Sequence, residues 1–164
     1  MPSLLLFAAE TLWREGLEFD LRFIGLYGWD TKLFRRWAKR LRKLGRALIA
    51  PPKASDSDLW SAYASATFTV FPSLHEGYGL PVAESLAFGV PVITTGYGST
   101  GEIAEGGGCL TVDPRNDTEL TDAMRTLLTE PAVLERLRAE AVARAPRGWA
   151  EFSAESWAHL VEEL

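Results

Sequence analysis

The feature that most constrains the fold is a regular alternation of short apolar runs with amphipathic segments along almost the whole chain. The apolar runs lie at residues 21–25, 47–50, 68–71, 90–94 and 109–112, and each is too short to be a typical helix. Helical spacing or capping residues mark 3–15, 32–44, 59–66, a segment from Pro81, 102–105, 117–129 and 131–144. Before 59–66, Ser55 with the acidic Asp58 three residues later predicts a helix N-cap. Parallel strands joined by crossover helices form right-handed βαβ units. We therefore predict an α/β fold, a Rossmann-like three-layer sandwich with a parallel sheet.

The length and composition fit one globular domain. A chain of 164 residues, 47% of them hydrophobic and 24% charged, can bury one core but not two. We predict that residues 1–146 form this domain, and that residues 147–164 form a terminal helix that packs on a partner domain. Cys109 is the only cysteine, and no run approaches the ~20 apolar residues that cross a bilayer. We expect a cytoplasmic location, at most peripheral to the inner face of the plasma membrane.

The charge is unevenly distributed along the chain. Residues 1–60 hold 11 Lys and Arg against 7 Asp and Glu, whereas residues 61–164 hold 6 against 15. Most of the basic residues lie at 30–46, where interleaved apolar residues predict an amphipathic basic helix. The basic side of this helix is interpreted first as a surface exposed to water. The alternative interpretation is peripheral contact with an anionic membrane. The acidic remainder would repel phosphate backbones, so we expect no nucleic-acid partner.

The chemistry is expected in the loop after the 68–71 strand, because open parallel sheets bind ligands beyond the carboxyl ends of their strands. This loop holds Gly77 and Gly79 on either side of Tyr78, and it leads into a helix with Pro81 in its first turn. The first N–H groups of a helix have no intrahelical acceptor and carry the positive end of the helix dipole. An anion such as a diphosphate is therefore the expected ligand.

Two glutamates flank this helix start: Glu76 lies in the loop, and Glu84 lies about one turn into the helix. Carboxylates repel phosphate but accept hydrogen bonds from sugar hydroxyls. The pair therefore suggests a ligand with hydroxyls on both sides of a diphosphate, which is the shape of a nucleotide sugar. Local chemistry alone leaves a second interpretation equally open, in which Glu84 complements the helix dipole and the two glycines only form a turn.

The run from Phe71 to Ile93 resembles the signature of the family-4 retaining glycosyltransferases. That signature has the form E-G-[FY]-G-L-P-x-x-E, followed by a small-residue helix and G-x-P-V, and residues 76–84 match it without a gap. Segments 23–25, 55–66, 98–103 and 110–114 are similar to others of the family, in the same order. The resemblance covers essentially the whole chain. It implies the C-terminal, donor-binding half of a two-domain GT-B enzyme.

The resemblance also implies roles for the matching residues. Glu76, the expected catalytic residue, would contact the donor hexose near the reacting centre, and Glu84 would bind the ribose hydroxyls. Six further residues are expected to bind the substrate or to adjoin the same cleft: Gly77, Tyr78, Gly79, Leu80, Gly98 and Ser99. His75 either contacts the donor or acceptor or hydrogen-bonds locally at the strand end. A weaker part of the resemblance places residues 50–53 beside the base.

The implied reaction transfers a hexose from a UDP-, GDP- or ADP-linked donor to a glycan, lipid-linked or small-molecule acceptor, with retention of configuration. The family's acceptor-binding half, and the Arg and Lys that neutralise its departing diphosphate, have no counterpart in this sequence. We therefore expect the chain to be inactive by itself. No metal-ligand spacing occurs, so we expect neither a metal nor another cofactor. A nucleotide-sugar epimerase of GT-B architecture and a non-catalytic nucleotide-binding module are the alternative functions.

Overall fold

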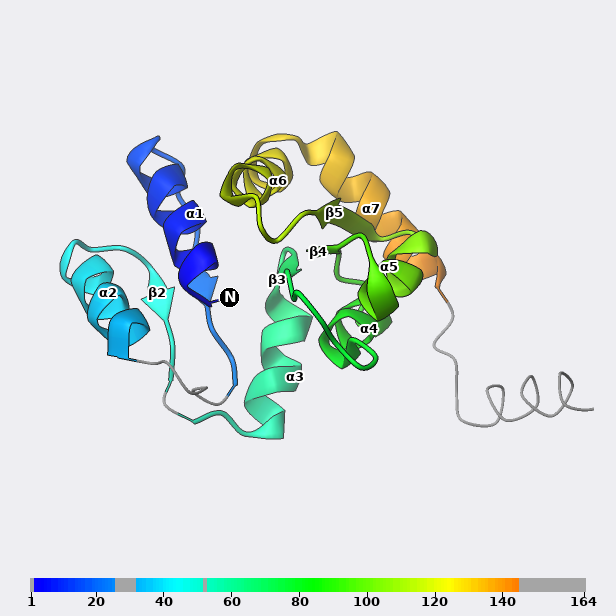
Figure 1. The fold of residues 1–164 in the computed structure, drawn as a ribbon, viewed down its shortest axis with the longest axis horizontal. Coiled ribbons are helices and arrows are strands. Elements are labelled where there is room, and N and C mark those ends of the chain that lie inside the picture. The colour runs from blue at the N-terminus through cyan, green and yellow to red at the C-terminus, as the bar shows by residue number, and fades with distance from the viewer. Residues whose placement is uncertain (1, 26–31, 52, 145–164) are drawn as a thin grey trace, which may run out of the picture.

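A computed structural model describes residues 2–25, 32–51 and 53–144 of the chain, and it alternates helices with short strands (Figure 1). The helices are α1 (Pro2–Arg14), α2 (Lys32–Lys43), α3 (Asp56–Ser65), α4 (Leu80–Ala87), α5 (Gly98–Glu105), α6 (Asp117–Thr129) and α7 (Pro131–Ala143). The strands are β1 (Leu21–Arg22), β2 (Leu48–Ile49), β3 (Thr69–Phe71), β4 (Val92–Thr95) and β5 (Cys109–Val112). The predicted alternation is confirmed. The terminal helix predicted at 147–164 lies outside the described residues.

Two boundaries differ from the sequence prediction in ways that affect the site. Helix α5 begins at Gly98, four residues before the segment predicted as helical, because the Gly101 N–H already donates to the carbonyl of Tyr97. Strand β4 runs to Thr95 rather than Thr94. The cap before α3 matches the prediction, since Ser55 and Asp58 form a capping box, but α3 begins at Asp56 rather than at residue 59.

All the strand pairing among the described residues is parallel. Leu21 pairs with Leu48 in one sheet, in the order β1-β2, and the other sheet has the order β3-β4-β5. The predicted α/β fold with parallel strands is confirmed. The structure adds that the described strands form two sheets, with no pairing between β1 and β3.

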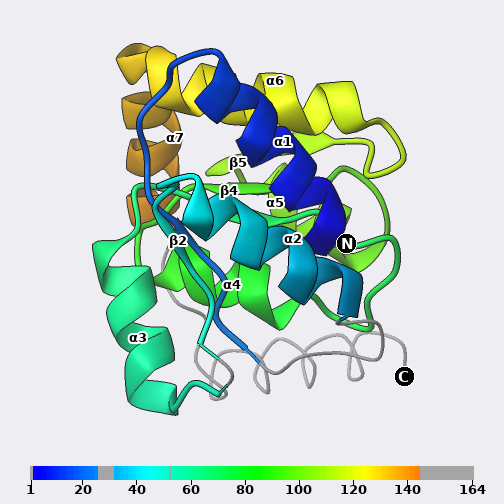
Figure 2. The same ribbon diagram turned by 90° about the vertical axis from the view of Figure 1, so that its left-hand side faces the viewer.

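Helices cover both faces of the three-stranded sheet. Val92 and Ile93 are neighbours on β4, so their side chains point to opposite faces. Ile93 belongs to the larger core cluster, which also holds buried residues of α1, α2 and α6. Val92 belongs to a smaller cluster with Val82 and Leu86 of α4. The three-layer arrangement therefore follows from the core, and Figure 2 shows α6 above β4 and β5 and α4 below them.

A buried carboxylate joins α1 to α2. Glu10 is only 8% exposed, and its oxygens accept hydrogen bonds from Trp37 Nε1 at 2.6 Å, Arg14 at 2.6 Å and Arg40 at 2.5 Å. Burial raises the pKa of this carboxyl, but the Trp37 hydrogen bond and the two guanidinium groups outweigh it and hold the pKa below its usual range. Glu10 therefore stays ionised in the folded protein.

Glu10→Gln is expected to lower the free energy of unfolding at neutral pH by about 1–3 kcal/mol. A larger loss is not expected, because Arg14 and Arg40 both reach solvent, which screens their ion pairs with Glu10. The folded pKa is depressed, so this stabilisation is present above the unfolded pKa of about 4.3 and is lost as the pH falls through the lower folded pKa. Urea unfolding between pH 7 and pH 3 should show a weaker acid dependence for this variant. Glu18→Gln, at an exposed position, is the control; an equal effect there would contradict the assignment.

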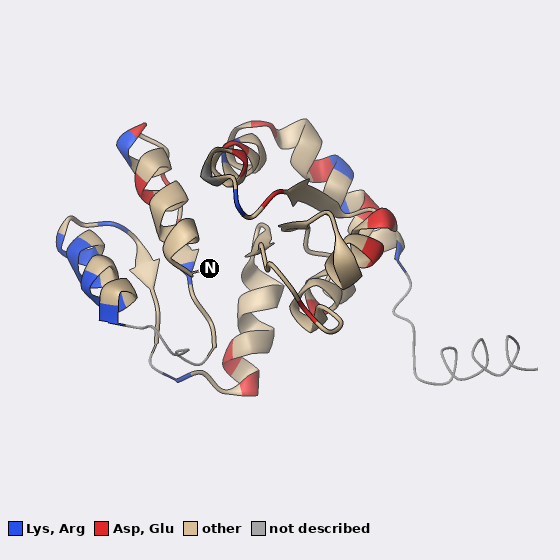
Figure 3. Cartoon of the chain, in the orientation of Figure 1, with Lys and Arg blue, Asp and Glu red and all other residues tan. Residues whose placement is uncertain are grey.

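The basic residues of α2 divide between the fold and the surface. Arg40 binds Glu10, and Arg42 donates to the carbonyls of Leu48 and Ala50. Figure 3 shows the blue segments concentrated on α2, at one side of the protein. None of the helices in the described ranges is long and apolar enough to cross a membrane. Peripheral membrane contact through residues 30–46 stays a prediction.

Candidate functional site

The loop between β3 and α4 is fastened to the neighbouring strand by hydroxyl groups. Thr94 Oγ1 donates to the carbonyl of Phe71 at 3.0 Å, and Thr95 Oγ1 donates to the carbonyl of Ser73 at 2.9 Å. Both threonines are fully buried. The path of the loop is therefore set where it leaves the sheet, which is the end at which such sheets bind ligands.

Glu76 is half-buried and held at two points. Ser73 Oγ donates to its Oε1 at 2.8 Å, and Ser99 Oγ donates to its backbone carbonyl at 2.9 Å. Ser99 lies in the first turn of α5, so the sequence-predicted residues Glu76 and Ser99 are in contact. The Oε2 atom of Glu76 has no partner among the described residues, which leaves one carboxylate oxygen for a ligand.

Gly79 is the N-cap of α4 and adopts the left-handed conformation, with φ 95° and ψ 42°. A Cβ atom there would lie 2.8 Å from Thr100 Cγ2, in the first turn of α5. Both the dihedral angle and the close approach require glycine. The consequence is that the N-termini of α4 and α5 lie side by side.

This junction presents unpaired backbone donors. In the described part of the chain, the N–H groups of residues 77–80 and of Gly98 and Ser99 have no hydrogen-bond acceptor. Two helix N-termini therefore direct unpaired donors and the positive ends of their dipoles to one place. Such an arrangement favours an anion.

Glu84 lies on the other flank of the α4 start. Its Oε2 accepts a hydrogen bond from Tyr63 Oη of α3 at 3.0 Å, and the same hydroxyl is 3.4 Å from the carbonyl of Pro81. Tyr63 is buried, and its burial together with the adjacent carboxylate raises the pKa of the phenol. Tyr63 thus stays a neutral donor that orients Glu84. The two glutamates are held from opposite sides, Glu76 by α5 and Glu84 by α3.

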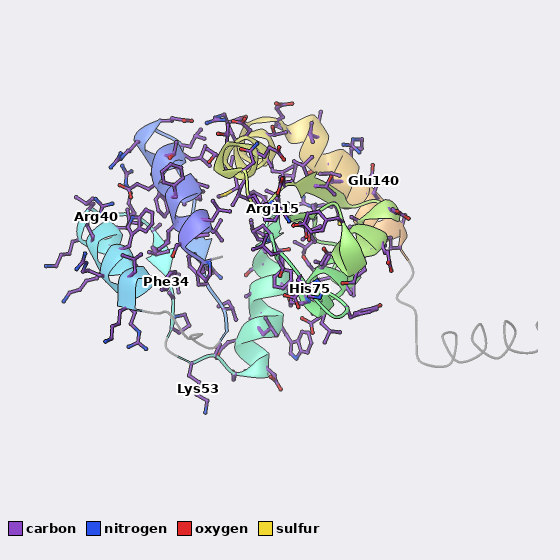
Figure 4. All side chains as sticks on the ribbon, in the orientation of Figure 1. Phe34, Arg40, Lys53, His75, Arg115 and Glu140 are labelled. Atoms are coloured by element: carbon purple, nitrogen blue, oxygen red, sulfur yellow. The ribbon has the colours of Figure 1, made fainter. Side chains whose placement is uncertain are left out.

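The remaining predicted residues of the loop are open to solvent. Tyr78 and Leu80 are each 61% exposed, and His75 and Gly77 are exposed as well. Figure 4 labels His75 on the loop beside α4. The side chains of Tyr78 and Leu80 have no role in the core, so their contribution to a site would come from the backbone or from contact with a ligand.

A groove of about 270 Å³ lies at the carboxyl ends of β1 and β2. Its apolar wall is formed by Ile24, Ile49 and Pro51, and Asp58 and Ser61 of α3 border it. Because α3 also carries Tyr63, this groove is on the Glu84 side of the junction. Pro51 falls in the segment 50–53 that the sequence resemblance placed beside the base.

Four residues that sequence reasoning missed support the site: Tyr63, Ser73, Thr95 and Thr100. Thr95 Oγ1 and Thr100 Oγ1 are 2.7 Å apart and buried, so they join β4 to the start of α5. The sequence does contain a signal for this contact: Thr94 and Thr95 lie at the end of the apolar 90–94 run, and a buried hydroxyl needs a hydrogen-bond partner. Within the described ranges no three His, Cys, Asp or Glu side chains gather as a metal site requires.

The fold and this junction define a Rossmann-like α/β domain with its polar loops at the strand ends. Comparison with protein families gives the particular family. The family model described as "Glycosyl transferases group 1" matches residues 2–144. The chain belongs to this family, which confirms the sequence resemblance to the GT-B glycosyltransferases.

Individual relatives agree with this assignment. The chain is 34% identical over 128 residues to the D-inositol 3-phosphate glycosyltransferase of Rhodococcus opacus (strain B4), covering 77% of this chain and 27% of that protein. It is 31% identical over 170 residues to the protein of the same name from Rhodococcus jostii (strain RHA1), covering 99% of this chain and 36% of that protein. This chain thus spans about a quarter to a third of the length of these relatives.

A solved structure shows the same fold. The sucrose-phosphate synthase of Thermosynechococcus elongatus superposes with a TM-score of 0.73 at 22% identity, over 99% of this chain and 43% of that one. At this identity the likeness concerns the fold alone.

Proposed function

We propose that this chain is the donor-binding half of a retaining glycosyltransferase, which binds a nucleotide sugar and contributes Glu76 to hexose transfer. The observation that supports it most is the junction of α4 and α5, where two helix N-termini with unpaired N–H groups lie between two oriented carboxylates. A diphosphate matches the donors, and hydroxyl groups on either side of it match the carboxylates.

The order of the features along the surface matches the order of groups in the donor. The apolar groove beside α3 would take the base, Glu84 the ribose, the helix junction the diphosphate and Glu76 the hexose. Ser73 occupies Oε1 of Glu76, so Oε2 would accept a hexose hydroxyl. Glu76 would therefore orient the donor and would not act as a general base.

The direct test is calorimetry of the 164-residue chain with UDP, GDP, ADP and their hexose conjugates. We expect one nucleotide to bind and its sugar conjugate to bind more tightly, because the conjugate adds the contact with Glu76. Glu76→Gln should remove that extra affinity and leave the affinity for the diphosphate unchanged. If no nucleotide binds, or if the Glu76 variant weakens both ligands equally, the proposed arrangement is wrong.

A longer form of the protein would test the reaction. We expect it to transfer the hexose to an acceptor with retention, and the 164-residue chain alone to release no product. NMR of the donor incubated without acceptor separates the epimerase alternative, which would convert the sugar while it stays attached to the nucleotide. Binding without transfer in the longer form would instead favour the nucleotide-binding module.

Tyr63→Phe tests the positioning of Glu84. Removal of the hydroxyl takes away one hydrogen bond to the carboxylate, and we expect nucleotide affinity to fall about 3- to 10-fold, which corresponds to about 1 kcal/mol. Calorimetry with the preferred nucleoside diphosphate measures this, and the same nucleotide with a 2′,3′-dideoxyribose is the discriminating ligand. Because that ligand lacks the hydroxyls Glu84 would bind, the variant and the unmodified chain should bind it equally. Unequal binding would assign Tyr63 a different role.

We also propose that α2 docks on anionic lipid from the cytoplasmic side. Exposed Leu33 of α2 and exposed Leu44, directly after its last residue, accompany exposed Lys39 and Lys43, a combination that suits a membrane surface. Vesicles containing phosphatidylserine should co-sediment with the chain at low salt, and neutral vesicles should not. Lys39→Glu with Lys43→Glu should abolish the binding, whereas Glu135→Lys, an exposed change on α7, should not impair it. Equal binding to both vesicle types would refute the proposal.

A further inference from the structure

An arginine that the proposed function does not use lies at the ligand-binding edge of the sheet. Strands β3, β4 and β5 are parallel neighbours, with Phe71 beside Thr94 and Thr95 beside Val112. The loops that follow these strands therefore leave the sheet at one edge, where open parallel sheets bind their ligands. The loops after β3 and β4 supply the junction of α4 and α5. The loop after β5 supplies the exposed Arg115, which Figure 4 labels.

Arg115 is directed toward the start of α5. Its Cζ lies 5.9 Å from the centroid of the Tyr97 ring, which is a cation–π distance. Tyr97 is the N-cap of α5 and is 40% exposed, so both members of the pair reach solvent. Pro114 is buried, and the N–H of Arg115 donates to Asp113 Oδ1 at 2.9 Å, which fixes the backbone from which the side chain extends. The guanidinium is thus positioned by its own turn and by Tyr97.

The charge of Arg115 is not neutralised by a neighbouring carboxylate in the described part of the chain. Both oxygens of Glu119 are engaged, one by the N–H of Asp113 at 2.7 Å and the other by Asn116 Nδ2 at 2.9 Å. Among the described side chains, none forms an ion pair with the Arg115 guanidinium. A guanidinium has five N–H donors in a planar fork, so this group can bind an anion.

The pair adjoins the Glu76 end of the candidate site. Ser99, two residues after Tyr97, donates to the carbonyl of Glu76 at 2.9 Å. A Cβ atom on Gly98, between Tyr97 and Ser99, would meet no atom within 4 Å, so the space beside this turn is open. Because β5 lies on the far side of β4 from β3, Arg115 continues the site beyond Glu76, at its saccharide end.

We propose that Arg115 and Tyr97 make the saccharide end of the site selective for a sugar that carries an anionic group, either a carboxylate or a phosphate. This inference rests on the proposed function, which puts the hexose at Glu76. The guanidinium would bind the anionic oxygens through two parallel N–H groups, and the exposed part of the Tyr97 ring would contact the sugar ring. The Glu76 carboxylate by itself repels such a group, so the cation beyond it decides whether an acidic sugar is accepted.

The anionic group arrives either on the hexose of the donor or on the acceptor, and both present the same chemistry to the guanidinium. A neutral sugar offers no ionised oxygen, and hydrogen bonds between charged partners are about twice as strong as those between neutral ones. The competing explanation is that Arg115 only packs on Tyr97 at the surface. In that case no ligand would depend on the guanidinium.

The donor arm of the test is calorimetry of the 164-residue chain with the glucuronate and glucose conjugates of the nucleoside diphosphate that binds. If the donor carries the charge, the glucuronate conjugate should bind about tenfold more tightly, and Arg115→Gln should abolish this difference without changing the affinity for the diphosphate. Arg115→Lys keeps the charge but not the planar fork, so it should retain only part of the preference. Arg36→Gln, the same change at an exposed position of α2, is the matched control and should retain all of it.

The acceptor arm uses NMR, which detects weak binding of free sugars. Glucose 6-phosphate, glucuronate, glucose and inorganic phosphate are each added with and without a saturating nucleoside diphosphate, and the cross-peaks of Arg115 Nε–H and the Tyr97 amide are followed. If the acceptor carries the charge, an acidic sugar should saturate these shifts at a concentration about tenfold below that of glucose or inorganic phosphate. Arg115→Gln should abolish the shift of the Tyr97 amide, and Arg36→Gln should not.

A preference in either arm that depends on Arg115 supports the proposal and identifies the source of the anionic group. The proposal is overturned if neither arm shows a preference for an acidic sugar, or if Arg115→Gln leaves the preference intact. Failure of the proposed function has a different signature, the absence of nucleotide binding. The acceptor arm without nucleotide then decides the role of Arg115 by itself.

Discussion

Glu84→Ala is expected to weaken binding of the nucleoside diphosphate by about 10- to 100-fold, because a carboxylate that accepts hydrogen bonds from ribose contributes about 1.5–3 kcal/mol. The truncation also leaves the buried Tyr63 hydroxyl without the carboxylate that now accepts its hydrogen bond. Glu84→Gln separates the two effects, since its amide oxygen can still accept from Tyr63. We expect Gln to lose about tenfold in affinity with unchanged stability.

Calorimetry and thermal unfolding of the same samples measure both quantities. Glu105→Ala is the matched control, because Glu105 is an exposed glutamate at the far end of α5 from the junction. Its affinity for the nucleotide should equal that of the unmodified chain. If Glu84→Ala binds as tightly as this control, Glu84 does not bind the ligand, and the helix-dipole interpretation of its position gains support.

Gly79→Ala is expected to destabilise the fold by about 2–4 kcal/mol. The left-handed conformation is strained for a residue with a side chain, and the new Cβ would press on Thr100 Cγ2 at 2.8 Å, which forces the starts of α4 and α5 apart. Binding of the diphosphate should fall with the stability, because the unpaired N–H groups no longer converge. Chemical unfolding and calorimetry measure the two effects.

Gly77→Ala provides a control within the same loop. A Cβ on Gly77 would meet no atom within 4 Å, and Gly77 does not have a positive φ. We expect its stability to change by less than about 0.5 kcal/mol, as for an exposed surface position. If both variants lose the same stability, the loop tolerates no side chain at either position. The contact between residue 79 and Thr100 would then not explain the destabilisation by Gly79→Ala.

Much of the fold was predictable because local pattern and tertiary environment agree. The apolar run at 68–71 became β3, the capping box at Ser55 and Asp58 starts α3, and the glycine loop leads into α4 as predicted. The division into two sheets was not predictable. Strand pairing depends on which edges meet in three dimensions, and the spacing of runs along a sequence does not contain that information.

The site was predictable where the motif is continuous. Glu76, Gly79 and Glu84 fall within nine residues, and the helix start between them follows from Pro81 and the glycines. Their supports come from distant segments: Tyr63 lies 21 residues before Glu84, and Ser99 lies 23 residues after Glu76. A single tyrosine or serine has no local pattern that marks such a contact, so these residues emerged only from the structure.

The unpaired donors at the helix junction belong to the main chain. Every amino acid other than proline carries the same N–H group, so the capacity to hold an anion there is nearly independent of which side chains Tyr78 and Leu80 bear. Under the proposed function, those two positions are free to change with the sugar or with a neighbouring domain, while the shape of the loop keeps the backbone donors in place for a phosphate. Diversity of donors within one family can arise in this way without rebuilding the domain.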